Sequence, residues 1–235
     1  MQPTTLLPGM WVGLLLLEGV VAFSLRQPTH AGNHHVRSRC FRMVEATSAA
    51  DEATLLAECR REERSLATIE QLVSSLKSQP LPTKPKKALL GDWLLEFASD
   101  AEAVGRITNG DVGPFAVIEG VIHRFLKGNE VESIEVLRRF GPFGNMKRSL
   151  NGRWGVDKDG EGQAIRWRYT YQIDGDGRER DTPKQETTEA QLGYSSSDLL
   201  IFGFGDSVLV FSRIPSLDTV LVDLRVAAPP EVEEK

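Results

Sequence analysis

The chain has little of what metal, redox and nucleic-acid chemistry needs. It carries only two cysteines among its 235 residues, Cys40 and Cys59, and both precede the strand-rich part. Two thiols cannot build a disulfide framework or a thiolate metal site. Basic residues are outnumbered, with 28 Lys and Arg against 33 Asp and Glu, and the formal net charge is −5. An acidic chain binds nucleic acid poorly, so a nucleic-acid partner is not expected.

Motifs for nucleophilic catalysis, phosphate binding and calcium binding are also missing. No Gly-x-Ser-x-Gly elbow is present, and a lone core histidine such as His123 is more often structural than catalytic. GFGDS at 203–207 lacks the third Gly and joins strand to strand. DGDGRERDTPKQ at 174–185 has Arg178 where a calcium loop needs an oxygen ligand, so a hairpin turn is expected there. Catalytic residues, a metal site and a cofactor are therefore not predicted.

A mostly apolar stretch opens the chain. Residues 6–22 read LLPGMWVGLLLLEGVVA, with Glu18 as the only charge. The apolar run is shorter than the roughly 20 residues of a membrane span and ends in small residues, which is typical of a signal peptide. We therefore predict a cleaved signal peptide over residues 1–22 and no transmembrane segment in the mature protein. Since the leading MQPTT carries no basic residue, a buried core helix or a single membrane anchor is the alternative.

The next segment is basic and free of acidic residues. Residues 23–44 hold four arginines and no Asp or Glu, as organelle transit peptides do. A signal peptide followed by such a segment, beginning at Phe23, resembles the bipartite plastid-targeting leader of algae with a red-lineage secondary plastid. This resemblance implies a plastid (chloroplast) location, with residues 23–45 as the transit segment. Because the segment is expected to be removed, its imidazoles and thiol are not assigned as metal ligands: His30, His34, His35 and Cys40.

A periodic segment follows and predicts one amphipathic helix over residues 48–78. Its apolar residues recur at alternating spacings of four and three, interrupted only by Glu62: Leu55, Cys59, Leu66, Ile69, Val73 and Leu76. Such a narrow stripe needs a partner surface. We expect it to pack across the folded domain, and a protein partner at the Leu55–Leu76 face is the alternative. PLPTKPKK at 80–87 predicts a semi-extended connector, so residues 46–88 form the helix and linker.

Short runs of β-forming residues separated by turn residues occupy residues 89–226. Eight or nine strands at roughly ten-residue spacing leave no room for crossover helices and predict an antiparallel meander. Because closure removes unpaired edges, we predict a mostly β fold, an antiparallel barrel preceded by one amphipathic α-helix. LDTVLVDLRV at 217–226 is a candidate for one more strand, and residues 227–235 are read as an acidic tail. The clearest strand alternates polar residues with Ile165, Trp167, Tyr169, Tyr171 and Ile173.

The start and the end of this region resemble the plastid lipid-associated protein (fibrillin, plastoglobulin) family. The family's late motif is similar to DLLIFGFGDSVLVF at 198–211. The resemblance covers about residues 50–214 and implies a lipocalin-like fold associated with plastoglobules or thylakoids. The family pattern Leu-x-Gly-x-Trp-x-Leu-x-(Tyr/Phe)-(Thr/Ala)-Ser is carried here by Leu89, Leu90, Gly91, Trp93, Leu95, Phe97, Ala98 and Ser99.

The resemblance also implies how one end of the barrel is closed. In lipocalin-like barrels a late arginine commonly lies against the indole of the Gly-x-Trp motif. Gly91 and Trp93 are accordingly expected to form a structural plug, with the indole buried. The family's late arginine position is occupied by Leu200 in this chain. The role of that arginine is therefore either lost or taken by another residue such as Arg213.

Aromatic side chains provide the candidates for ligand contact. In a barrel they either fill the interior or line a cavity for an apolar ligand, such as a lipid, an isoprenoid or a pigment. The six candidates are Trp154, Trp167, Tyr169, Tyr171, Phe202 and Phe204. GPFGNM at 141–146 places Phe143 at a hairpin tip, where it either contacts a lipid surface or folds back into the mouth.

Three functions are consistent with these features. The first is a non-enzymatic plastid lipid-associated protein that binds an apolar small molecule or a lipid surface. The second is an assembly factor or stable subunit of a photosynthetic membrane complex, which would use the Leu55–Leu76 face. The third is a bilin lyase-like enzyme, since that activity also uses a lipocalin-type barrel, although this barrel has no cysteine.

Overall fold

The computed structural model describes residues 48–110, 116–139, 145–157, 163–182 and 184–226. The predicted signal peptide, transit segment and acidic tail, and the loop residue Phe143, lie outside these ranges. Among the described residues, no helix is long and apolar enough to cross a membrane.

The helical segment before the strands consists of two helices, so the prediction of one continuous helix over 48–78 is wrong. A first helix covers residues 48–59, and α2 covers Leu66–Lys77. The Ser65 side chain accepts the Thr68 backbone N–H and caps α2. The Glu58 carboxylate accepts the Ser65 N–H at 2.6 Å and pairs with Arg61. These polar contacts stabilise a turn where the periodic pattern suggested unbroken helix, and the Ser65 N–H holds the pKa of Glu58 below its usual value.

The predicted connector at 80–87 is also partly helical. Helix α3 covers Pro85–Leu89 and has proline in its first turn. Proline fits this position because its missing N–H would have no helical partner there and its φ is already suitable. Of the three prolines in the connector, Pro85 therefore begins a helix. This helix buries Leu89 next to the start of the first strand.

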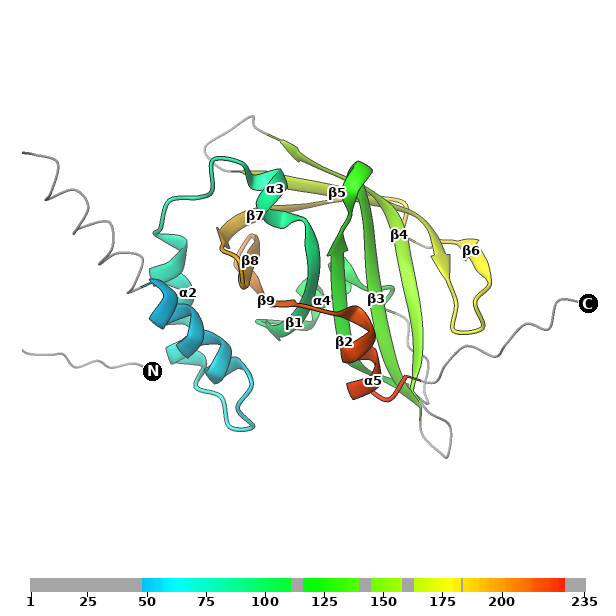
Figure 1. Ribbon diagram of the computed structural model, residues 1–235, viewed down its shortest axis with the longest axis horizontal. Helices are drawn as coiled ribbons and strands as arrows, with labels where there is room; N and C mark the ends of the chain where they lie inside the picture. Colours follow the sequence, from blue (N-terminus) through cyan, green and yellow to red (C-terminus); the bar gives the residue numbers. More distant parts are fainter. Residues whose placement is uncertain (1–47, 111–115, 140–144, 158–162, 183, 227–235) are drawn as a thin grey trace, which may run out of the picture. The chain divides into compact units, whose positions relative to one another are not determined.

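The strands form one antiparallel sheet that closes on itself, which confirms the predicted antiparallel β-rich fold. Each of eight strands pairs with two neighbours in the order β1-β2-β3-β4-β5-β7-β8-β9, and β9 pairs with β1 (Figure 1). The short β6 pairs only with β5. The strands are β1 Gly91–Ala98, β2 Ala116–Phe125, β3 Glu130–Arg139, β4 Met146–Asp157, β5 Ala164–Ile173, β6 Glu179–Asp181, β7 Thr187–Ser195, β8 Leu199–Phe204 and β9 Ser207–Ile214.

The inside of the ring holds the largest hydrophobic core, which we call the interior core. Directly opposed residues in a sheet share a face, so the register Trp93–His123–Ser133–Leu150 places all four side chains inside. The interior core contains, among others, Trp93, Phe125, Leu150, Trp167, Phe202 and Phe211. It is also the place where the aromatic candidates of β4, β5 and β8 meet.

The two N-terminal helices cover the outer face of one wall of the ring (Figure 1). Leu55, Cys59 and Leu76 are fully buried against that wall. The wall contributes outward-facing side chains of β1, β7, β8 and β9: Phe97, Tyr194, Leu199, Ile201 and Val210. This double coverage explains why β8 is one unbroken apolar run, whereas β5 alternates because its outer face meets solvent.

The Leu55–Leu76 face was predicted to pack on the folded domain, and it does. The alternative, that it serves a partner protein, gains no support, because this apolar surface is already buried within the chain. Leu66, at the first position of α2, is the exception and is 60% exposed.

Two further helices pack on the ring. Helix α4, Ala101–Ile107, is capped by Asp100, whose carboxylate accepts the Ala103 N–H, and it buries Ile107 in the interior core.

Residues 217–226 do not add a strand. Leu217–Asp223 form α5, capped by Ser216 and packed on outward-facing Ile122 and its neighbours. A Ser N-cap before seven helical residues prevails over their β propensity.

Candidate functional site

The aromatic interior is the first element of the candidate site. Trp154 lies against Phe125 with ring centroids 4.8 Å apart. Trp167 lies 6.1 Å from Phe202 and 6.0 Å from Phe204. These rings are buried, and their tilted and edge-to-face arrangements are those that aromatic quadrupoles favour. The structure thus brings five of the six predicted residues into the interior core: Trp154, Trp167, Tyr169, Phe202 and Phe204.

The two tyrosines of the predicted set differ from each other. Tyr169 is buried and its hydroxyl donates to the Ile107 carbonyl at 3.4 Å, so α4 provides its polar partner. Burial raises the pKa of Tyr169, which keeps the phenol neutral. Tyr171, two residues further along β5, is only half-buried and lies outside the interior core.

Trp93 and Arg213 pack against each other where α3 leads into β1. The Trp93 indole is fully buried, and its N–H donates to the Leu89 carbonyl of α3 at 2.8 Å. The Arg213 guanidinium lies 4.2 Å from the centre of the indole, as a cation–π pair. Arg213 also donates to the carbonyls of Leu90 and Ala88, at 2.9 and 3.0 Å, and to that of Ser197. It therefore joins β9 to the connector between α3 and β1.

Gly91 lets this guanidinium reach its place. Its φ is +135°, and a Cβ at this position would lie 2.3 Å from Nη1 of Arg213. A side chain at residue 91 is thus excluded both by backbone conformation and by space. Leu200, at the family's late arginine position, is buried in the interior core and takes no part in these contacts.

His123 is the interior residue whose environment the sequence did not reveal. It is fully buried, with ring centroids 4.7 Å from Phe125, 5.3 Å from Trp167 and 6.3 Å from Phe211. Burial lowers its pKa to about 3, so the imidazole is neutral at physiological pH. The alternation Val121–His123–Phe125 was the available signal that it points inward.

A charged group lies on β3, two residues after Ser133, the residue that faces His123. Glu135 is fully buried and faces Arg148 across the β3–β4 ladder, where the two side chains form an ion pair. The same carboxylate accepts the backbone N–H of Asn109, which follows α4. Burial lowers the pKa of nearby Lys184, an effect that Glu135 opposes. The interior is therefore aromatic around Trp167 and charged around Glu135.

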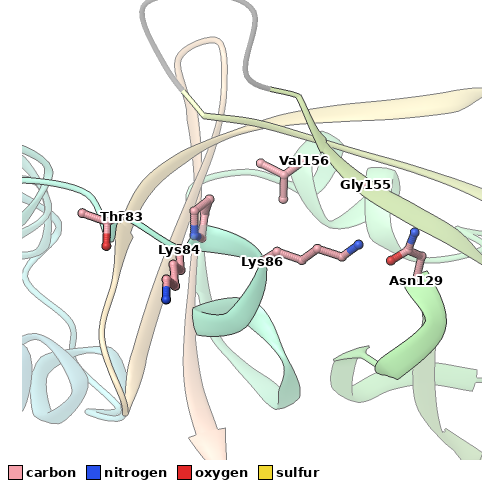
Figure 2. A pocket seen from close by; sticks show the side chains of 7 residues that line it. Thr83, Lys84, Lys86, Asn129, Gly155 and Val156 are labelled. Carbon is pink, nitrogen blue, oxygen red and sulfur yellow. The ribbon is translucent and has the colours of Figure 1, made fainter.

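A separate pocket lies beside α3, outside the predicted site (Figure 2). It has a volume of about 450 Å³. The ammonium of Lys86, one of its lining residues, lies 5.9 Å from the centre of the Trp154 ring. Its lining comes from Thr83, Lys84, Pro85, Lys86, Asn129, Gly155 and Val156.

Comparisons with protein-family models, with curated proteins and with solved structures found no match to this chain.

The rejected motifs have structural roles in the chain. The backbone N–H groups of Asp174 and Gly177 close the β5–β6 hairpin at 2.9 Å, which confirms the expected turn. Gly205 turns the chain directly from β8 into β9 with φ of +63°. Ser196 donates to Glu52 at 2.7 Å and so ties the β7–β8 turn to the first helix. Among the described residues, no group of three or more His, Cys, Asp or Glu side chains could hold a metal ion.

Proposed function

We propose that the protein is a lipocalin-like barrel that holds one apolar small molecule inside its ring of strands. The observation that supports this proposal is the closed ring of eight antiparallel strands around a hydrophobic core rich in aromatic side chains. A ring of about eight strands encloses a space suited to side chains or to one small ligand. On this proposal the Trp93–Arg213 pair is the plug at one end, and the ligand enters from the other; the contacts that support it are the cation–π pair and the indole hydrogen bond.

Apolar burial provides the driving force for such binding. Each Å² of apolar surface removed from water stabilises the complex by about 25 cal/mol. Aromatic rings add directional contacts that favour ring-containing or unsaturated ligands. The resemblance to plastid lipid-associated proteins points to a lipid, an isoprenoid or a pigment as the ligand. It also points to plastoglobules or thylakoids as the place of action.

The two alternatives have less support. An assembly factor would need a docking surface, and the helix face considered for that purpose is buried against β7–β9 and β1. A bilin lyase would need reactive groups near the pigment. The described cysteine, Cys59, lies outside the ring under the helices, and burial raises its thiol pKa to about 11.

The test is to identify what the purified chain retains. An organic-solvent extract analysed by mass spectrometry should contain an apolar compound in roughly equimolar amount. Phe202→Leu, inside the ring, should weaken retention roughly three- to tenfold, because it removes aromatic contacts. Val222→Ala, at a 74% exposed position on α5, is the control and should retain the compound. A chain that carries no apolar compound and does not float with lipid droplets would contradict the proposal.

A further inference from the structure

The pocket beside α3 is a cavity whose charged lining residues are all positive. Its volume of about 450 Å³ lies within the range of roughly 300–1,000 Å³ that is typical of small-ligand sites. Lys84 and Lys86 line it, and no Asp or Glu of the described chain does so. Pro85 and Val156 add apolar wall. The pocket therefore offers positive charge and apolar surface to the same molecule.

This positive charge is a local property of the segment that leads into the first strand. Residues 71–91 hold four lysines and no Asp or Glu, although the whole chain has a formal net charge of −5. Within the described part of the chain, the ion pairs include neither Lys84 nor Lys86. Their charge is thus available to a molecule in the pocket.

The acidic residues next to the pocket lining are each paired with an arginine. Glu130 follows the lining residue Asn129, and its carboxylate lies 3.7 Å from Arg153. Asp157 follows the lining residue Val156 and forms an ion pair with Arg166. These two carboxylates therefore do not cancel the charge of the lysines.

Lys86 and Asn129 present hydrogen-bond donors to the same space. The Lys86 ammonium lies 5.9 Å from the centre of the Trp154 ring, a cation–π distance, and its side chain extends toward Asn129 in Figure 2. Asn129 has a φ of +65°, a left-handed conformation that asparagine adopts more readily than most residues. The Lys84 ammonium points away from Lys86 in the same view, so its contribution is the weaker one.

The donors restrict the chemistry of the ligand. An ammonium donates up to three hydrogen bonds, an amide nitrogen donates two, and lysine binds phosphate as a point charge. We propose that this pocket binds the phosphate group of an organic phosphate, with Lys86 as the main cationic contact and the Asn129 amide as a second donor. The apolar wall then contacts the organic part of the ligand. This site goes beyond the proposed function and does not depend on it.

The test is calorimetric titration of the full chain with glycerol 3-phosphate, with glycerol as the uncharged probe. Only the phosphate ester should bind, and added salt should weaken its binding. Lys86→Met should weaken binding about tenfold and Lys84→Met about twofold. Lys87→Met is the matched control, because it removes the same charge from the same helix but does not line the pocket. It should leave the affinity unchanged.

A second arm distinguishes a soluble phosphate ester from a lipid headgroup. Vesicles of phosphatidylcholine with and without phosphatidic acid are floated with the wild-type chain and with Lys86→Met. Flotation that needs both phosphatidic acid and Lys86 supports the site and assigns it to a lipid phosphate. Glycerol 3-phosphate binding without such flotation supports the site and assigns it to soluble esters. Absence of both, or equal losses in Lys86→Met and Lys87→Met, would overturn the inference.

Discussion

At the scale of single residues, Arg213 makes contacts that join three parts of the chain. It lies over Trp93 and donates to carbonyls on the α3–β1 connector and on the β7–β8 turn. Arg213→Met should lower the free energy of unfolding by about 2 kcal/mol, because a cation–π contact and charged hydrogen bonds are lost together. Urea unfolding measures this. Arg153→Met, at an exposed pair with Glu130 at 3.7 Å, is the matched control and should cost less than about 1 kcal/mol.

Gly91 gives a second test of the same contact. Gly91→Ala should displace the guanidinium, since the added Cβ would lie 2.3 Å from it. The double variant with Arg213→Met should therefore lose less stability than the sum of the single variants. Gly177→Ala, also at positive φ but with open space around it, is the control and should add to Arg213→Met independently. If the stability losses of Gly91→Ala and Arg213→Met added fully in the double variant, the contact between residue 91 and the guanidinium would be contradicted.

His123 should make the protein sensitive to acid. Its pKa is lowered to about 3 by burial, whereas the unfolded chain takes up the proton near pH 6.5. His123 therefore leaves the free energy of unfolding unchanged above about pH 6.5 and lowers it progressively as the pH falls from 6.5 toward 3, because only the unfolded chain then binds the proton. The slope is up to about 1.4 kcal/mol per pH unit. Urea unfolding of the wild type and His123→Leu between pH 7 and 4.5 isolates this slope from that of the carboxylates. Identical pH slopes of the unfolding free energy in the two proteins would refute the assigned effect of His123.

At the scale of elements, the helix pair is bound to the ring by one apolar face. Leu76 of α2 is fully buried against the outer wall, whereas Leu66 of the same helix is 60% exposed. Leu76→Ala should cost about 3 kcal/mol, and Leu66→Ala less than about 1 kcal/mol. Thermal and urea unfolding compare the pair directly. Equal costs would mean that α2 does not pack on the sheet through this face.

At the scale of the whole molecule, closure should make the eight strands open together. The terminal strands β1 and β9 pair with each other, so the ring presents no free edge from which it can unravel. Native-state hydrogen exchange should give β1, β4, β5 and β9 amides one common opening free energy. Amides of β6, which pairs on one side only, should exchange at least about tenfold faster. A β4–β5 seam that opens well below the common value would contradict this behaviour.

The local pattern of the chain by itself determined where the eight strands of the ring lie and that they are antiparallel, but it did not predict β6 and it suggested a strand where α5 lies. Side-chain alternation, Asp-Gly turns and short connections depend on neighbours in sequence, and they marked the β5–β6 turn and the inward set containing Trp167. The amphipathic stripe likewise showed that the N-terminal helices need a covering surface. These features could be read without coordinates because each is encoded within about ten residues.

Only the tertiary structure decided which distant groups meet. The Glu58 carboxylate accepts the Ser65 N–H at the turn that interrupts the expected helix. Arg213 lies over Trp93. The His123 imidazole is enclosed among aromatic rings and has no hydrogen-bond partner in the described part of the chain. Each outcome depends on the sheet register or on the path of the backbone across the fold, and residue spacing carries no record of either. Alternation along β2 indicates that His123 faces inward. It does not indicate which rings surround the imidazole, because Trp167 and Phe211 belong to other strands of the ring.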